Sequence, residues 1–276
     1  MLVIVFIALN GFTKNQKDKC FKTKEIKKVM LKAAKWQFAH PKHELWDWTN
    51  GAFYAGVSAA YKATKEKTYL EAMMKMGEEN QWKPGPRLQH ADDIAICQTY
   101  IDIYQLKKDK AIIQPFVDNM EKFMVTPFPV KGIEKITWWW CDALFMAPPA
   151  LVKLSVATGD MRYMECSNKL YHECYDLLYN KEEHLFARDL GYVIKGEASD
   201  RYETNGEKIF WSRGNGWVMG GLALLLNELP KDNIERAFFE QVYKEMADKI
   251  ASIQQSDGLW RASLLDPLSY PGGEAS

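Results

Sequence analysis

The sequence lacks the features that mark several common classes of protein. Its five cysteines are an odd number without a Cys-x-x-Cys pair, so they indicate neither a disulfide scaffold nor a cysteine-bound metal. Its 36 basic and 36 acidic residues give a formal net charge of zero, whereas nucleic-acid-binding proteins usually carry a basic excess. It contains no phosphate-binding loop and no Gly-x-Ser-x-Gly motif, and its histidines lack the spacing of metal ligands. We therefore predict no metal site and no nucleic-acid partner.

No apolar run in the sequence is long enough to cross a bilayer as a helix. Residues 1–12 are almost wholly apolar, but they are too few for a membrane span. They have the apolar character of a secretion signal without its usual basic lead-in. We assign residues 1–23 to an apolar N-terminal segment, the remnant of a signal, and predict an exported, periplasmic protein. A cytoplasmic location is the alternative.

What the sequence does contain is a repeated pair of helices. After a leading helix, an apolar helix, a polar turn and a more amphipathic helix follow one another four times, which is typical of a helical array. The turns lie at Glu66, Asp109, Asp160 and Asp232. The predicted helices are the leading one at 24–39, then 51–63 with one ending near 80, 93–106 with 111–124, one ending near 157 with 161–178, and 216–228 with 234–254.

The two helices of each pair differ in character. The first is apolar nearly all round, which predicts burial on every side, while the second carries a charged face. We therefore predict an all-α protein whose helices form two concentric layers, an α/α toroid. Pro148 and Pro149 either kink the third inner helix or lie in its first turn. The helical period fails between 185 and 210, where we predict short strands at 186–188 and 208–210.

Aromatic and polar residues gather in four clusters, one at the start of each inner helix. The clusters are 46–50, 90–93, 138–142 and 211–215. Because the inner helices of a toroid run parallel, their N-terminal ends should share one mouth and bring the clusters together. Helix N-termini favour an anion, and aromatic side chains suit a sugar ring. The sequence therefore predicts a cavity for an acidic sugar at this mouth.

Some residues of these clusters have a simpler alternative role. Asp92 and Asp93 also suit the N-cap of a helix, and the same holds for Asn50 and Asn215. Asp142 follows three consecutive tryptophans, and a carboxyl group walled by indoles is desolvated, which raises its pKa and suits a general acid. At least one of the three tryptophans must pack in the core, because all three cannot face the cavity.

Four stretches of the sequence carry a resemblance to a known family. FWSRGNGWVM at 210–219 is the specific motif, and it is supported by DALFM at 142–146, RLQHADDIAICQTYIDIY at 87–104 and LWRASLLDPLSYP at 259–271. In these stretches the chain resembles glycoside hydrolase family 105, the unsaturated rhamnogalacturonyl hydrolases, and more distantly the unsaturated glucuronyl hydrolases.

The resemblance implies one domain over residues 24–276 with the family fold, an (α/α)6 barrel or six-hairpin toroid. Nine helices are predicted from this sequence, whereas the family barrel is closed by twelve. We therefore expect the barrel to be incomplete at its C-terminus, as in a truncated domain.

The resemblance also implies an activity. Members of the family remove a 4,5-unsaturated galacturonyl or glucuronyl residue from the non-reducing end of polysaccharide-lyase products, such as rhamnogalacturonan and pectin oligosaccharides. The reaction is hydration of an enol ether, in which an aspartic acid protonates C4, water adds at C5 and the resulting hemiketal opens. It needs no cofactor, so an unsaturated oligosaccharide is the predicted partner.

Residue roles follow from the same matches. Asp142 matches the acid and base, and Asp92 matches the second carboxylate best, with Asp93 as the alternative. Arg213 and Trp217 match substrate-binding positions. The clusters and the resemblance together give these predicted substrate-binding residues: Trp46, Asp47, His90, Asp93, Trp140, Arg188, Trp211, Arg213 and Trp217.

Two functions from other classes compete with this prediction. One is a non-catalytic glycan-binding toroid, which the presence of Asp142 disfavours. The other is a helical scaffold for proteins, which would carry varied or charged residues at the mouth rather than tryptophans beside carboxylates.

Overall fold

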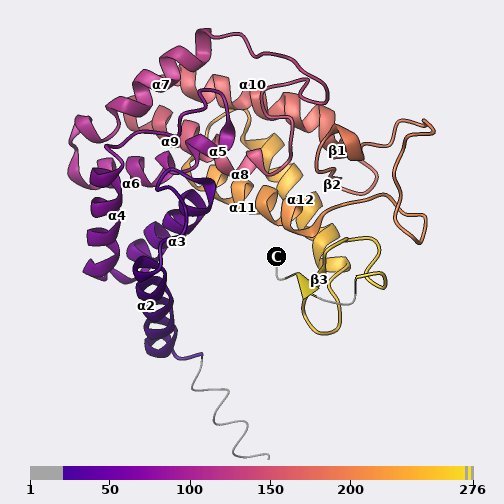
Figure 1. The fold of residues 1–276 in the computed structure, drawn as a ribbon, viewed down its shortest axis with the longest axis horizontal. Coiled ribbons are helices and arrows are strands. Elements are labelled where there is room, and N and C mark those ends of the chain that lie inside the picture. Colours follow the sequence, from indigo (N-terminus) through magenta and orange to yellow (C-terminus); the bar gives the residue numbers. More distant parts are fainter. Residues whose placement is uncertain (1–20, 271–272, 275–276) are drawn as a thin grey trace, which may run out of the picture.

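The computed structural model describes residues 21–270 and 273–274, and these form a mostly helical protein (Figure 1). The predicted signal remnant and Cys20 lie outside the described residues, apart from 21–23. The leading helix is α2 (Thr23–Ala39). The inner helices are α3 (Trp48–Thr64), α5 (Ala91–Ile94) with α6 (Cys97–Lys107), α8 (Ala143–Met146) with α9 (Pro148–Thr158), and α11 (Ser212–Glu228). The outer helices are α4 (Lys67–Glu79), α7 (Gln114–Val125) after the 3-10 helix η1 (Lys110–Ile112), α10 (Met161–Leu178) and α12 (Arg236–Ser252).

The helix pairs follow one another around an open arc. Figure 1 shows α2 at one end of the arc and α12 with β3 at the other, with α4, α7 and α10 on the outer side. The predicted burial on every side holds for the second and third inner helices. It is wrong for the first and last, α3 and α11, which bury only one face because they lie toward the ends of the arc. Every residue of Cys97–Ile103 in α6 and of Pro148–Ser155 in α9 is buried, whereas α10 buries only one stripe of its surface. The prediction of an all-α fold with an inner and an outer helix in each pair is confirmed.

Three of the four polar turns share one construction. Inner helices α3, α6 and α9 end on a left-handed residue, which is Lys65, Lys108 or Gly159. The acidic residue that follows then caps the next helix. The carboxylates of Glu66, Asp109 and Asp160 each accept a hydrogen bond from the backbone N–H two residues later. The turn positions were visible in the sequence because this cap requires a specific residue type.

The third inner helix is interrupted rather than kinked. Helix α8 ends at Met146, and α9 begins at Pro148, so both prolines lie in the first turn of a new helix. A proline there costs nothing, since the first N–H groups of a helix have no partner within it.

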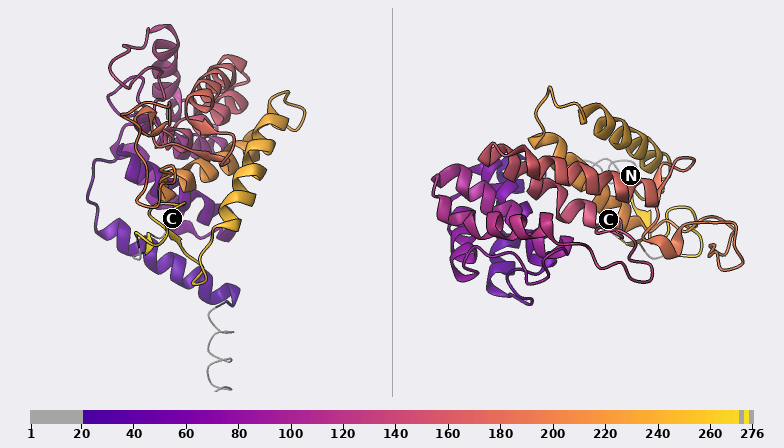
Figure 2. Two further views of the ribbon diagram at one scale, coloured as in Figure 1. Left: turned by 90° about the vertical axis from the view of Figure 1, so that its right-hand side faces the viewer. Right: turned by 90° about the horizontal axis from the view of Figure 1, so that it is seen from above.

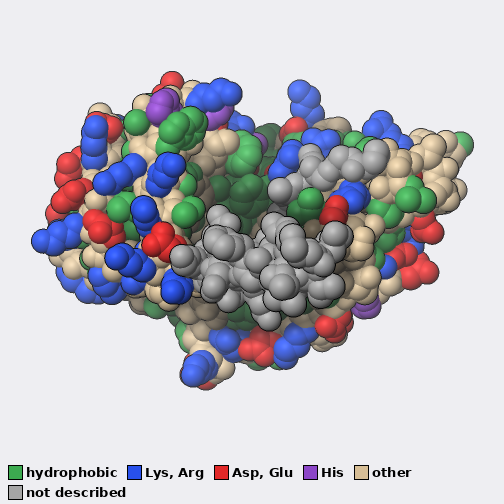
Figure 3. Space-filling model, turned by 90° about the horizontal axis from the view of Figure 1, so that it is seen from below, with side chains coloured by type: hydrophobic (Ala, Val, Ile, Leu, Met, Phe, Trp, Pro, Cys, Tyr) green, Lys and Arg blue, Asp and Glu red, His purple; other side chains and the backbone are tan. Residues whose placement is uncertain are grey.

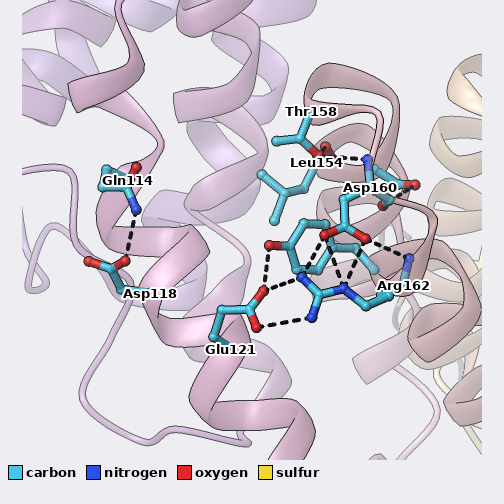
Figure 4. A network of polar contacts seen from close by, with 9 residues as sticks. Gln114, Asp118, Glu121, Leu154, Thr158, Asp160 and Arg162 are labelled. Atoms are coloured by element: carbon cyan, nitrogen blue, oxygen red, sulfur yellow. Dashed lines mark hydrogen bonds and ion pairs between the residues drawn. The ribbon is translucent and has the colours of Figure 1, made fainter.

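A polar network on the outer layer joins α7 to α10 (Figure 4). The Arg162 guanidinium lies 2.8 Å from Oε1 of Glu121 and 2.6 Å from Oδ2 of Asp160. The Tyr163 hydroxyl donates to the same Glu121 carboxylate. Because these groups are exposed, we expect only a small contribution to stability from each pair.

The segment between α10 and α11 is only partly as predicted. Strand β1 (Tyr179–Asn180) pairs with β2 (Leu185–Phe186), the 3-10 helix η2 spans Leu190–Tyr192, and β3 (Trp260–Arg261) pairs with β4 (Gly273–Glu274). The predicted strand at 186–188 is wrong beyond Phe186, because the buried Asn215 amide binds both the N–H and the C=O of that residue. The predicted strand at 208–210 is also wrong, since Lys208 forms only an isolated bridge to Tyr202.

Two chain segments far apart in sequence form the end of the molecule beyond the helices. Figure 2 shows the loop before α11 and the segment after α12 projecting together at one end. Asn205 donates to the carbonyl of Leu265, and Thr204 donates to Asp266. Figure 3 shows hydrophobic side chains inside a hollow on the face seen from below, with Lys and Arg side chains on both sides of it. Within the part of the chain that the structure describes, no helix is long and apolar enough to cross a membrane.

Candidate active site

The N-terminal ends of the inner helices meet, as predicted. Helix α8 packs against α3, α5 and α11, and α3 also packs against α5. Two glycines permit this approach. A Cβ on Gly51 would lie 2.6 Å from the Cβ of Ala95, and one on Gly221 would lie 2.3 Å from the carbonyl oxygen of Leu144. The helices are therefore in backbone contact at this mouth.

Aromatic side chains line the mouth from several elements. The Trp217 ring of α11 meets Trp48 of α3 edge-on at 6.0 Å and lies 4.7 Å from Phe145 of α8. The Trp140 ring lies 4.6 Å from the His90 imidazole. Trp138 is fully buried in the core, which confirms that at least one of the three consecutive tryptophans serves in packing.

The structure separates the two adjacent aspartates of α5. The Asp93 side chain is 1% exposed and binds Arg87, whose backbone N–H donates to Oδ2 at 2.6 Å and whose Nε donates to Oδ1 at 2.9 Å. Asp93 therefore fixes the preceding loop. The Asp92 side chain keeps 20% exposure, and neither residue caps the helix, because the N-cap position belongs to His90.

The carboxyl groups of Asp92 and Asp142 both have raised pKa values. Burial raises the pKa of Asp92 to about 7, and the charge of Asp142 adds to the rise. Burial also raises the pKa of Asp142, while Arg188 and Arg213 oppose that rise. The Asp92 carboxyl group therefore keeps a proton up to near-neutral pH.

The His90 imidazole is neutral beside this pair. Burial and the Arg87 charge lower the pKa of His90 to about 4. Its Nδ1 lies 3.7 Å from Oδ2 of Asp92 and has no hydrogen-bond partner among residues 21–270. The Nδ1 atom is itself buried, so the imidazole packs against Trp140 with this nitrogen directed away from solvent.

Some of the remaining polar side chains of the clusters form hydrogen bonds with backbone groups, and one does not. Asp47 caps α3 by accepting from the N–H of Thr49 at 2.9 Å. The Asn50 amide donates to the carbonyl of Glu44, so Asn50 and Asn215 fix loops instead of capping helices. Asp142 occupies the N-cap of α8, but its side chain makes no capping hydrogen bond. Its carboxyl group is therefore available for chemistry.

A cavity of about 590 Å³ lies beside the segment that carries Asp142, because the N–H of Cys141 donates to the carbonyl of Arg188 in the cavity lining. Its lining residues are Arg188, Tyr192, Arg201, Glu203, Ile209, Trp211, Arg213, Ala262, Ser263 and Tyr270. The Arg213 guanidinium lies 4.6 Å from the centre of the Trp211 ring. One wall forms where residues 210–212 pair with the later segment, through hydrogen bonds from the N–H of Ser212 to Ala262 and from the N–H of Leu264 to Phe210.

Comparison with known proteins decides the family. The family model described as Glycosyl Hydrolase Family 88 matches residues 22–276. The chain belongs to glycosyl hydrolase family 88. The motif stretches predicted a resemblance to family 105 and to the unsaturated glucuronyl hydrolases. The match confirms this group of unsaturated uronyl hydrolases, families 88 and 105.

Members of family 88 and their structural neighbours resemble the chain over most of its length. It is 44% identical over 263 residues to the unsaturated 3S-rhamnoglycuronyl hydrolase of Formosa agariphila, a match that covers 91% of this chain and 70% of that protein. It is 32% identical to the protein of the same name from an Alteromonas species, covering 80% of this chain and 56% of that protein. A solved structure titled a polysaccharide lyase superposes with a TM-score of 0.83 at 31% identity, covering 91% of this chain and 73% of that one.

The structure places the predicted site residues of this family 88 chain in three groups. Asp92, Asp142, His90, Trp140 and Trp217 lie at the mouth. Arg188, Trp211 and Arg213 line the adjoining cavity. Asp47 and Asp93 hold the backbone, and Trp46 is half-buried against the core.

The sequence did not point to the cavity residues that lie in the irregular segment between α10 and α11. Tyr192, Arg201 and Glu203 lie where the helical period fails, so no periodic pattern pointed to them. Tyr270 stood inside the motif stretch at 259–271, which was the one signal that could have found it. No group of three or more His, Cys, Asp or Glu residues arranged to hold a metal ion occurs within the described ranges.

Proposed function

We propose that the chain is a hydrolase that removes a 4,5-unsaturated uronic acid from the non-reducing end of a lyase-derived oligosaccharide in which the uronate is attached to rhamnose. The observation that carries the proposal is the presence of two carboxyls with raised pKa values, Asp92 and Asp142, at an aromatic mouth. The names of the Formosa and Alteromonas relatives support the reaction and the rhamnose linkage.

In the proposed mechanism Asp142 acts first as an acid. Its carboxyl group gives a proton to C4 of the double bond, and the positive charge that develops at C5 is shared with the ring oxygen. The resulting carboxylate then takes a proton from the water that adds at C5, which restores the acid. The hemiketal opens and releases the next sugar. Burial raises the pKa of Asp142 above its ordinary value, which keeps the acid protonated to a higher pH and makes its carboxylate a better base in the second step.

The other residues orient the substrate or lie close to Asp142. The charge of Asp142 favours the protonated form of Asp92, so Asp92 is suited to donate a hydrogen bond beside the acid. Arg213 lies close enough to Asp142 for its charge to act on that carboxyl group. Its planar guanidinium is suited to the uronate carboxylate, because it can donate two hydrogen bonds to that group. Trp217 and Trp140 offer ring faces to the sugar.

We also propose that the helix pairs belong to an (α/α)6 barrel within one domain over residues 24–276. The TM-score of 0.83 and the arc of paired helices support this architecture. Export of the protein stays a prediction.

A polysaccharide lyase is the second candidate, because the structural neighbour at 31% identity carries that title. The two activities change ultraviolet absorbance in opposite directions. A hydrolase destroys the absorbing enol ether of an unsaturated disaccharide, whereas a lyase creates that group when it cleaves a saturated polymer.

The test follows absorbance in two parallel incubations. With an unsaturated uronyl-rhamnose disaccharide we expect absorbance to fall, and with the saturated parent polymer we expect no change. A rise with the polymer would favour the lyase, and equal cleavage of a saturated uronyl disaccharide would contradict enol-ether hydration. Heat-denatured protein serves as the control for spontaneous loss of absorbance.

A further inference from the structure

A buried carboxylate that the proposed mechanism does not use lies beside the segment that carries Asp142. The Asp189 side chain is 7% exposed, and it follows Arg188 in the irregular segment after β2. Trp140 and Asp189 face each other in an isolated antiparallel bridge, and the N–H of Cys141 donates to the carbonyl of Arg188 at 2.9 Å. The backbones that carry Asp189 and Asp142 therefore run side by side.

The two oxygens of the Asp189 carboxylate have different partners. Oδ1 accepts a hydrogen bond from the N–H of Gly191 at 2.8 Å and so caps the 3-10 helix η2. Oδ2 lies 3.8 Å from Nε of Arg188. A neutral asparagine can still make the first contact through its amide oxygen, but it cannot balance the charge of the guanidinium. One substitution therefore separates the cap from the charge.

The Arg188 charge acts on two carboxyl groups. Among the side chains that the structure describes, Arg188 forms an ion pair with Asp189 and none with Asp142. Burial raises the pKa of Asp142, the Arg188 charge opposes that rise, and the Asp189 charge adds to it. Because the proposed reaction starts from protonated Asp142, it benefits from a carboxylate that pairs with Arg188 instead.

Other titratable and charged groups also surround Asp142. Asp92 of α5 and Arg213 of α11 interact with it electrostatically, and so do the thiols of Cys141 and of Cys174 in α10. Burial raises the pKa of both thiols, so they stay neutral near pH 7. Near neutral pH, the charges that act on Asp142 are therefore those of carboxyl groups and arginines.

We propose that Asp189 is a positioning residue for the acid, because its carboxylate pairs with Arg188 and keeps that guanidinium from forming an ion pair with Asp142. This role rests on the proposed function, which makes Asp142 the acid. Asp189 acts through Arg188 and transfers no proton itself. The cap to Gly191 holds the Asp189 carboxylate in place for this task.

The test uses Asp189→Asn, which keeps an oxygen for the cap of η2 and removes the charge. The pH dependence of kcat/KM is measured with an unsaturated uronyl-rhamnose disaccharide, because it reports the titration of the acid in the free enzyme. We expect the alkaline limb to move to lower pH by about 0.5–1 unit. At a pH above the limb, activity should therefore fall by about three- to ten-fold. A merely structural role would lower activity equally at every pH, and an unmoved limb would overturn the proposal.

The matched control is Asp200→Asn in the same irregular segment. The Asp200 carboxylate also accepts hydrogen bonds from backbone N–H groups, those of residues 195–197. It forms no ion pair with Arg188 among the described side chains, so this variant should keep the wild-type limb. Asp189→Glu keeps the charge and should also keep the limb, even if the cap is weakened.

A double variant tests the route through Arg188. In Arg188→Gln the group that Asp189 is proposed to hold is absent. Adding Asp189→Asn to Arg188→Gln should therefore move the limb by less than Asp189→Asn moves it in the wild type. An equal movement in both backgrounds would overturn the proposal.

A titration without substrate separates the role of Asp189 from the proposed function. Carboxyl NMR, with the Asp142 signal assigned from Asp142→Asn, should show that Asp142 titrates at lower pH in Asp189→Asn than in the wild type. If the disaccharide is not cleaved but this difference is found, the proposed reaction is wrong and the effect of Asp189 on Asp142 is supported. If the disaccharide is cleaved and Asp142 titrates equally in both proteins, the proposed role of Asp189 is wrong.

Discussion

The two ends of the inner helices carry aspartates whose pKa values are shifted in opposite directions, although Asp102 at the far end is the more buried. At the mouth, Asp92 and Asp142 form no ion pair with a described lysine or arginine, and burial raises the pKa of both. In the latter half of the same helices, burial alone would raise the pKa of Asp102, but Lys153, Lys62 and Ser58 together hold it below its ordinary value. Burial therefore does not decide whether an aspartate keeps a proton; its partners do.

The far end is a complete ionic network. Asp102 and Lys153 are 5% and 4% exposed, and Oδ1 of Asp102 lies 2.9 Å from the ammonium groups of both Lys153 and Lys62. The Ser58 hydroxyl donates to Oδ2 at 2.6 Å, and Glu228 lies 3.9 Å from Lys153. Helices α3, α6, α9 and α11 each supply one charged residue, so this network joins the whole inner layer. The mouth leaves its carboxyls unpaired for chemistry, while the far end holds the helices together.

The largest expected effect is on activity at the mouth. Asp142→Asn removes the proposed acid and base with little change in shape, so we expect turnover to fall by roughly 100- to 10,000-fold while the fold is retained. Ultraviolet loss of the enol ether and circular dichroism measure the two properties. Asp248→Asn, on the exposed face of α12, is the matched control and should behave as wild type. Near-normal turnover of Asp142→Asn would contradict the role of Asp142 as the acid and base.

The next effect is on stability at the far end. Asp102→Asn leaves the buried Lys153 ammonium without its charge partner, which should lower the free energy of unfolding by about 3–5 kcal/mol in urea titrations near pH 7. Because the folded pKa of Asp102 is lowered, its contribution is present above the unfolded pKa and is lost as the pH falls through the folded value. The difference from wild type should therefore shrink in acid. The double variant Asp102→Asn/Lys153→Met should recover part of the loss, and a loss under about 1 kcal/mol in the single variant would contradict the network.

A change of opposite sign is expected at Asp92. Its pKa rises from an ordinary 3.8 to about 7, so the unfolded chain releases this proton near pH 4 and the folded chain near pH 7. Wild-type stability therefore falls across this interval, and Asp92→Asn, which has no such proton, should be more stable at pH 8 by up to about 4 kcal/mol. Below pH 4 the difference should vanish. Unfolding free energies measured from pH 4 to 8 would refute this if the variant were equally stable or less stable throughout.

The smallest effect concerns the hydroxyl at the far end. Ser58→Ala removes one hydrogen bond to the buried Asp102 carboxylate, so we expect a loss of about 1–2 kcal/mol in unfolding free energy. The pKa of Asp102 should rise, because this bond favours its charged form, and carboxyl NMR titration would report that rise. An unchanged pKa would show that the two lysines alone set the charge of Asp102.

Local signals in the sequence predicted more of this molecule than long-range ones did. The turns at Glu66, Asp109 and Asp160 were predictable because each acidic residue caps the helix that follows it. The different roles of Asp92 and Asp93 were not predictable from local signals. Arg87 binds Asp93 from the loop before α5, and no helical periodicity describes the path of that loop.

The far-end network was invisible for another reason. Asp102 and Lys153 are 51 residues apart, and each stands alone in a helix that otherwise reads as apolar. Only the packing of the inner helices brings them together, so the helices could be predicted from sequence but this contact between them could not.

The pairing of residues 210–212 with 262–264 has a consequence for synthesis on the ribosome. The two segments of this wall are translated about fifty residues apart, and α11 and α12 lie between them in the sequence. Asp92 and Asp142 therefore leave the ribosome before the segment that completes the cavity wall. A slow codon between 213 and 258 would lengthen the interval between the two.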